Sequence, residues 1–398
     1  MPFGTAEHSR ERSVSRAQAA ARRIGGWLAA GGTVSAAGTE PGPAGVVLTS
    51  PGAVAWACGG IAPPVDRTAA VDVVWAVFTA DRAALITSNV EADRIGEEYG
   101  PAGHGFAELA SVPWQDPAGF VHAAERLAGV PAARLAADGH PAFGQDASND
   151  LIALRLALSA AERDDLADLG RDAVAAVQSA LRAWRPGERD LDIQARCAAG
   201  LEAAGADAPV LIVGGDDRLE RYRHPMAVGA PVRRLVMAVV VARRAGLHVA
   251  ATRFATAAPL DPGYVRLRRR VLGIERAVLD ACRPGAAYGT ALAALAAGYG
   301  QAGAPGGWAG HYQGGPIGFA QREFEIAPDQ QDSRWYGQPV AAGHAIAWNP
   351  SLPGGAKTED TYLVTEDGLA LITHASDWPA EPDDERQPPR PAVLEVAS

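Results

Sequence analysis

An uninterrupted apolar run from Leu235 to Ala242 constrains the fold of this chain more than any other segment. The run has the length of a β-strand. It is much shorter than the roughly 18 apolar residues of a membrane-spanning helix. No other apolar run in the sequence is longer. We therefore expect no membrane span and predict that this run is one strand of a curved sheet.

Further strands and helices are predicted on both sides of this run. Ser159 and Glu162 have the spacing of a capping box, which predicts a helix that ends near Trp184, before Pro186. Another helix should start at Asp190. The remaining elements are strands at 210–213, 247–254, 345–348, 358–364 and 370–373 and helices at 262–282 and 288–301. Helices packed on a mainly antiparallel sheet make an α+β arrangement.

The chain divides near residues 140–158. Before this boundary, short apolar runs broken by Gly and Pro alternate with helical stretches, which is typical of a smaller α/β domain. The tail after Trp378 is rich in Pro, Asp and Glu, which favours disorder. We therefore predict a flexible segment over 1–25, an α/β domain over 26–150, a larger domain over 155–376 and a disordered tail over 380–398.

Composition excludes some functions and suggests a compartment. The formal net charge of -10 and the pI near 5.4 argue against a nucleic-acid partner. The Arg-rich N-terminus lacks the apolar core of a secretion signal. Cys58, Cys197 and Cys282 are scattered and outside any metal-binding spacing, which favours reduced thiols. We expect a cytoplasmic protein with a small-molecule substrate and no membrane partner.

Three motifs in the second half of the chain are the candidate site. They are His311-Tyr-Gln-Gly-Gly-Pro-Ile-Gly318, then Trp348-Asn349-Pro350, then Thr358-Glu359-Asp360-Thr361. This ordered set resembles the creatinase/aminopeptidase P family, the pita-bread hydrolases. The resemblance covers roughly residues 155–375. It implies a pita-bread C-terminal domain, a smaller creatinase-type N-terminal domain, and a homodimer in which that N-terminal domain helps to form the partner's site.

Members of this family usually bind two divalent metals with two Asp, one His and two Glu. His311 and Glu359 match two of these positions, but Val239, Ala250 and Asn349 stand at the other three. The two divalent cations of such a site lie about 3.5 to 4 Å apart, and they need several carboxylates to offset their charge. We therefore expect no metal and no other cofactor. A single metal on His311 and Glu359 is the alternative, although two protein ligands fall short of the usual three.

His224, in Arg221-Tyr-Arg-His-Pro225, stands where the family places a His that faces the substrate. By resemblance to creatinase, it would be the proton-transfer residue. Histidine suits that role because its pKa lies near neutrality. The alternative is an ordinary surface-loop His before a proline.

Other residues are candidates for binding the substrate. Glu359 either contacts the substrate, together with His311, or forms an ion pair with Lys357 or Arg253. Asn349 supplies a donor and an acceptor. The remaining candidates for substrate binding are Arg253, Arg322 and Tyr312. A guanidinium can bind a carboxylate through two hydrogen bonds, but Arg322 can equally be a surface charge.

These observations predict a metal-independent hydrolase that cleaves a C–N bond in a small guanidino, ureido, amide or cyclic-amidine substrate. His224 would move the protons, while His311 and Glu359 would bind and polarise the substrate. A lyase or isomerase is the first alternative, because two histidines also support proton shuttling. A non-catalytic binding protein is the second. An Xaa-Pro metallopeptidase is the least favoured, because Val239 and Ala250 cannot bind metal.

Overall fold

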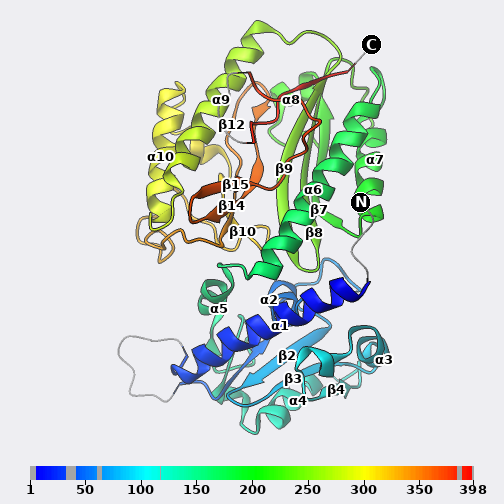
Figure 1. Cartoon of the computed structure of the whole chain (residues 1–398), viewed down its shortest axis with the longest axis vertical. Coiled ribbons are helices and arrows are strands. Elements are labelled where there is room, and N and C mark those ends of the chain that lie inside the picture. The colour runs from blue at the N-terminus through cyan, green and yellow to red at the C-terminus, as the bar shows by residue number, and fades with distance from the viewer. Residues whose placement is uncertain (1–5, 33–41, 61–64, 117, 383–387, 397–398) are drawn as a thin grey trace. The chain divides into compact units, whose positions relative to one another are not determined.

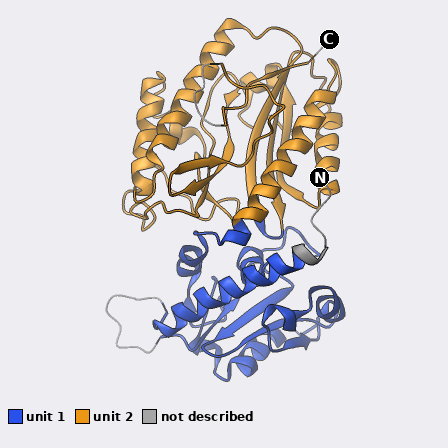
Figure 2. Cartoon of the chain, in the orientation of Figure 1, with its two compact units in different colours: residues 1–162, 245–247 blue, residues 163–244, 248–398 orange. Residues whose placement is uncertain are grey.

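The computed structural model describes residues 6–32, 42–60, 65–116, 118–382 and 388–396. The chain forms two compact units (Figure 2). The first contains residues 1–162 and 245–247, and the second contains residues 163–244 and 248–398. Within the described ranges, no helix is both long and apolar enough to cross a membrane.

The first unit is built on a six-stranded mixed sheet in the order β4-β3-β2-β1-β5-β6. β1 pairs antiparallel with β2 and parallel with β5, and α4 packs against β2 and β3 (Figure 1). The strands are β1 Gly45–Leu48, β2 Val74–Thr79, β3 Ala83–Ser88, β4 Leu109–Val112, β5 Leu135–Ala137 and β6 Gln145–Asp146. The helices are α1 Ala6–Ala29, α2 Pro51–Ala57, α3 Ala92–Arg94, α4 Gly119–Ala128 and α5 Ser148–Arg155.

The predicted flexible segment at residues 1–25 is wrong for most of its length, because α1 begins at Ala6. Ala17, Ala20 and Ile24 are buried at helical spacing. In the sequence, arginines interrupt this narrow apolar stripe. The segment therefore lacks the clear apolar periodicity that predicts a packed helix. Residues 1–5 lie outside the described residues.

The second unit contains two four-stranded sheets and a short hairpin. One sheet has the order β16-β9-β8-β7 and the other the order β10-β11-β14-β15. The strands are β7 Asp207–Gly215, β8 Leu235–Arg244, β9 Leu247–Thr256, β10 Gly314–Ile317, β11 Ala345–Trp348, β12 Ser351–Leu352, β13 Ala356–Lys357, β14 Asp360–Thr365, β15 Gly368–Leu371 and β16 Leu394–Glu395. All of the strands predicted for this region are confirmed, with ends shifted by a few residues.

Helices flank these sheets (Figure 1). α7 packs against β7, and α9 packs against α10. The helices are α6 Ala160–Ala183, α7 Asp190–Ala203, α8 Asp217–Arg221, α9 Pro262–Ala281 and α10 Tyr288–Gln301. The predicted capping box is confirmed: the Ser159 amide donates to Glu162 Oε2 at 2.6 Å, and the Glu162 amide donates to Ser159 Oγ at 3.4 Å. Helices packed against these mainly antiparallel sheets confirm the predicted α+β class.

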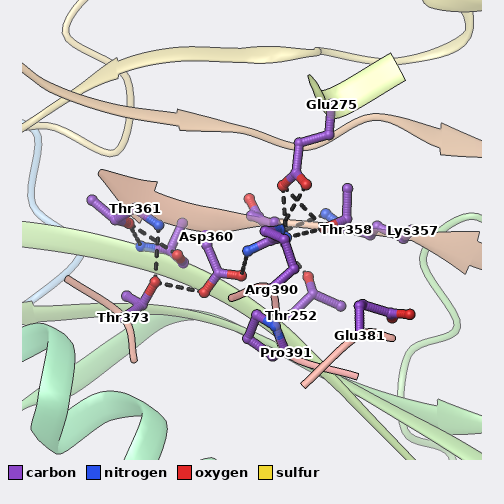
Figure 3. Close-up of polar contacts among 12 residues, drawn as sticks. Thr252, Glu275, Lys357, Thr358, Asp360, Thr361, Thr373, Glu381, Arg390 and Pro391 are labelled. Carbon is purple, nitrogen blue, oxygen red and sulfur yellow. Dashed lines mark hydrogen bonds and ion pairs between the residues drawn. The ribbon is translucent and has the colours of Figure 1, made fainter. Parts of the chain in front are cut away.

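The predicted disordered tail is also wrong where the structure describes it. β16 pairs parallel with β9, and Arg390 is only 2% exposed. The Arg390 guanidinium forms an ion pair with Glu275 at 2.6 Å and a second, shorter one with Asp360 (Figure 3). The Pro-rich and acidic composition concealed a buried arginine that helps to fasten the described part of the tail to the second unit. Residues 383–387 and 397–398 lie outside the described residues.

His344, just before β11, predicts a loss of stability in acid. Its Nδ1 lies 3.0 Å from the Tyr288 hydroxyl, and burial lowers its pKa to about 4. In the unfolded chain His344 has a pKa near 6.5, so it binds a proton at a higher pH than in the folded chain. Its contribution to the free energy of unfolding is therefore fully present above pH 6.5 and is lost as the pH falls towards 4. At pH 5 the loss from this group should be about 2 kcal/mol.

Urea unfolding at pH 7.5 and pH 5 measures this loss. His344→Asn keeps an acceptor for Tyr288 but does not titrate in this range, so its unfolding free energy should fall less between the two pH values. Equal losses in the variant and the unmodified protein would show that His344 does not contribute.

Candidate active site

The loop between α8 and β8 carries Arg223 and His224, and two aspartates hold it. Asp190 is fully buried at the start of α7 and accepts hydrogen bonds from the backbone amides of Val228, at 3.1 Å, and of the following glycine, at 2.7 Å. Asp216 accepts from three successive backbone amides where the loop joins β8, at 2.7, 2.9 and 3.0 Å. Charge-assisted hydrogen bonds thereby fix the loop, together with the buried side chains of Pro225 and Val232.

His311 forms a hydrogen-bonded pair with Ser351. Its Nε2 lies 2.9 Å from Ser351 Oγ, and its Nδ1 contacts the Tyr312 backbone carbonyl. A carbonyl only accepts, so Nδ1 must carry the ring proton. Burial first, and then the charges of Arg223 and Lys357, lower the pKa of His311 to about 3. The ring is therefore neutral near pH 7, and its bare Nε2 accepts the hydroxyl proton of Ser351.

Two buried side chains hold this pair in place. The Tyr299 hydroxyl accepts a hydrogen bond from the Ser351 amide at 3.1 Å and lies 2.9 Å from Gln313 Oε1. The Gln313 amide group donates to the backbone carbonyls of Trp308 at 2.8 Å and of His311 at 3.0 Å. The segments that carry His311 and Ser351 are thus tied together by one polar network.

Glu359 lies between β13 and β14 and is 2% exposed. Its Oε2 accepts hydrogen bonds from the Lys357 ammonium at 2.8 Å and from the Thr252 hydroxyl at 3.0 Å. Its Oε1 lies 3.6 Å from the Arg322 guanidinium. Glu359 thus forms the ion pair with Lys357 that was the alternative to substrate contact. The alternative partner, Arg253, is not used.

Lys357 is the only lysine in the chain, which otherwise uses arginine for its cations. It is buried on β13, and its neighbour across the antiparallel pair is Ser351. Residues directly opposite each other in such a pair have neighbouring side chains on the same face. Burial lowers the pKa of the ammonium, while its pairing with Glu359 opposes that shift.

His224 is exposed and is influenced by the same charges. Its pKa is lowered first by partial desolvation, then by Lys357 and Arg223, with Glu359 acting in the opposite direction. The imidazole is therefore kept neutral near pH 7. A neutral imidazole accepts a proton, which is the state that the predicted proton-transfer role needs.

A cavity of about 220 Å³ lies beside this cluster. Three cationic side chains and Ser351 contribute to its wall, together with the carboxylate of Glu220. The cations are Arg221, Arg223 and Lys357. Lys357 is paired with Glu359, and Arg221 lies 3.9 Å from Asp217, so Arg223 is the cation of this wall that would attract an anionic ligand.

The residues at the metal positions implied by the resemblance do not fit a pair of divalent cations. Val239 and Ala250 have no ligand atoms and are buried in β8 and β9. Glu359 already binds the ammonium of Lys357, whose positive charge repels a metal. Asn349 Oδ1 is buried without a hydrogen-bond partner among the described atoms, but it is a lone neutral oxygen. Throughout the described ranges, no three His, Cys, Asp or Glu side chains are grouped to hold a metal.

Two of the predicted substrate-binding residues have other contacts. Arg253 is buried and pairs with Asp360 at 2.8 Å, so its guanidinium braces β9 against β14 and is not available to a substrate. Tyr312 is 68% exposed, and a hydrogen bond to Glu325 raises the pKa of its phenol. Its backbone carbonyl, rather than its side chain, contributes to the site. Arg322 does lie beside the cluster, through Glu359.

Three members of the cluster were not predicted as site residues: Arg223, Ser351 and Lys357. Period-two alternation was an available signal, because Lys357 stands two residues before Glu359 and so shares its face. The use of one lysine among many arginines was another. Ser351 follows Asn349-Pro350 closely, but only the fold brings it to His311.

No protein-family model matches the chain, and no curated protein matches it. Solved structures do match it. Dipeptidase PepE from Mycobacterium ulcerans has a TM-score of 0.70 at 20% identity, over 97% of this chain and 98% of that one. An Xaa-Pro dipeptidase from Bacillus anthracis has a TM-score of 0.68 at 15% identity, over 96% and 100%. The chain has the pita-bread fold.

The pita-bread fold confirms the predicted resemblance to the creatinase/aminopeptidase P family. The same fold occurs in the N-terminal domain of the FACT complex subunit SPT16 from chickpea, Cicer arietinum. That structure has a TM-score of 0.63 at 13% identity, over 92% of this chain and 96% of that one. Because a fold alone does not specify chemistry, the function must be argued from the residues of the site.

Proposed function

We propose that this pita-bread protein is a metal-independent hydrolase that cleaves a C–N bond in a small substrate bearing a carboxylate. The observation that carries the proposal is the buried ion pair of Lys357 and Glu359, at 2.8 Å. This pair places the cation of Lys357 beside Glu359, the one carboxylate that the chain keeps at the metal positions implied by the resemblance. Lys357 and Arg223 then supply the positive charge that stabilises negative charge developing on a substrate carbonyl oxygen.

His224 is the proton carrier in this proposal. Its pKa is lowered, so it is neutral near pH 7 and takes a proton from the attacking water. The same proton then passes to the leaving nitrogen, which restores the neutral imidazole. As the pH falls through the lowered pKa, His224 becomes protonated and cannot act as the base, so activity should decline on the acid side.

The charges of the cavity narrow the substrate class. A guanidino or amidine cation could pair only with Glu220 of the cavity wall, which lies among three cationic residues, because Glu359 is already engaged by Lys357 and Arg322. An amide or ureido compound with a carboxylate fits the arginines of the cavity wall better. Two of the structural neighbours are named dipeptidases, which supports an amide as the bond that is cut.

Hydrolysis of a panel of N-acyl and N-carbamoyl amino acids in EDTA tests this proposal. We expect amine release to persist in the chelator and to fall by about 10²-fold or more in His224→Ala. His122→Ala replaces an exposed histidine of the first unit and should have no effect. Activity that EDTA abolishes and added manganese or zinc restores would contradict a metal-independent reaction.

A non-catalytic binding protein is the second candidate. The saturation of Glu359 by Lys357 and Arg322 favours it, since a carboxylate in two ion pairs does not take part readily in proton transfer. The same panel separates the two candidates. Binding of N-acyl amino acids in calorimetry without turnover, unchanged in His224→Ala, would support a binding protein.

A further inference from the structure

The hydrogen bonds of Ser351 and His311 form a nucleophile-and-base pair. Ser351 Oγ lies 2.9 Å from His311 Nε2, and the Tyr312 carbonyl fixes the tautomer in which Nε2 has no proton. This is the arrangement that activates a serine hydroxyl: the base is within hydrogen-bond reach, and a third group orients it. In this chain the orienting group is a backbone carbonyl.

Two positively charged neighbours of Ser351 favour loss of its hydroxyl proton. The Arg223 guanidinium donates a hydrogen bond to Ser351 Oγ, and Lys357 stands opposite Ser351 in the β12–β13 register. Nearby cations stabilise the alkoxide relative to the hydroxyl. They also stabilise the oxyanion that forms when the alkoxide adds to a carbonyl.

The same cations weaken His311 as a base in the empty site. Their charges contribute to its low pKa, after burial. A substrate carboxylate bound in the cavity would offset the charges of Arg223 and Lys357 and raise the pKa of His311 towards its ordinary value. An anionic substrate would thus strengthen the base, while the larger effect of burial on its pKa would remain.

Ser351 also lies where a substrate can reach it. It forms part of the wall of the 220 Å³ cavity, next to Arg223 and Lys357. The cavity and the hydrogen-bonded pair are independent observations, and both include Ser351.

We propose that Ser351 is a catalytic nucleophile and that His311 is its general base. The proposal deepens the proposed function and rests on it for the choice of a C–N substrate, and it replaces direct attack by water with transfer of the acyl group to Ser351. Ser351 Oγ adds to the substrate carbonyl carbon while its proton moves to His311 Nε2. The C–N bond then breaks, the proton passes from His311 to the leaving nitrogen, and an ester on Ser351 remains. Water adds to the ester, His224 takes the water proton, and that proton returns to Ser351 Oγ as the carboxylic acid leaves.

A biotin-tagged fluorophosphonate tests the nucleophile without knowledge of the substrate. Ser351 Oγ would displace fluoride from phosphorus, with its proton passing to His311. We expect one probe per chain, located on Ser351 by peptide mass spectrometry. Ser351→Ala should not be labelled, and His311→Gln should be labelled about 10²-fold more slowly or less. Ser376→Ala, at an exposed serine of the same unit, should be labelled like the unmodified protein.

A thiol variant keeps the test valid if Ser351→Ala fails to fold. Ser351→Cys retains a nucleophile of similar size, and the three natural cysteines are buried. We expect iodoacetamide to modify residue 351 first, and loss of that selectivity when His311→Gln is added. A fluorophosphonate label on a different residue, or no label on the folded protein, overturns the proposal.

The two proposals can fail separately. If amides are hydrolysed in EDTA and folded Ser351→Ala is as fast as the unmodified protein, water attacks directly: the proposed function stands and Ser351 is not the nucleophile. If Ser351 is labelled but no C–N substrate is turned over, the nucleophile stands and the proposed function fails.

Discussion

Replacing Arg390 by Met should lower the free energy of unfolding by about 4 kcal/mol, because removing one partner of a buried ion pair leaves the other charge uncompensated. Arg390 forms ion pairs with both Glu275 and Asp360 and contacts the Thr358 hydroxyl. Arg253 would still pair with Asp360. In contrast, Glu275 would lose an ion pair in a position that is 1% exposed. Urea unfolding followed by circular dichroism measures the loss.

The matched control for Arg390 lies on the same helix as Glu275. Arg276 and Asp280 form an exposed pair at 3.8 Å, with two thirds of each side chain in solvent. Arg276→Ala should change the unfolding free energy by no more than about 1 kcal/mol. A loss in Arg390→Met as small as that in the control would show that the described part of the tail is not fastened to the unit by this arginine.

Replacing Lys357 by Met should have the second large effect. It should lower the free energy of unfolding and raise the pKa of two histidines. Glu359 would lose its ammonium partner in a buried position, which should cost about 3 kcal/mol or more. His224 and His311 would each lose a positive neighbour, so the pKa of both should rise. The acid decline of activity would then move to higher pH, because His224 would be protonated earlier.

Proton NMR of the histidine rings from pH 8 down to about pH 3 follows these pKa shifts. Lys357→Arg keeps the positive charge, so the two histidines should titrate close to their values in the unmodified protein. Unchanged histidine titration in Lys357→Met would show that the lysine does not act on them. It would also remove the electrostatic basis of the proposed reaction.

The sequence predicted the second unit well because its signals are local. Apolar runs such as Leu235–Ala242 and the capping box at Ser159 depend on neighbouring residues only. The errors arose where a long-range contact decides the outcome. Arg390 lies in a composition typical of disorder, yet it is buried by Glu275, which precedes it by 115 residues. α1 is held by burial of small residues that carry little sequence signal.

The site was predicted only in part, because several of its contacts join residues that are far apart in the sequence. His224, His311 and Glu359 were found through a resemblance, and the structure places them under the influence of shared charges. Arg253 was misjudged, because its buried partner Asp360 is apparent only once β9 and β14 are side by side. Ser351 gained its importance from a 2.9 Å contact with a residue 40 positions earlier.

The single lysine has a practical consequence for following this molecule. A protease that cuts only after lysine has one peptide bond in the whole chain to attack, between Lys357 and Thr358. Both residues are buried in the folded protein, so that bond becomes a substrate only when the strand pair β12–β13 opens. The rate of this one cut would therefore report how often the site opens, without any label attached to the protein.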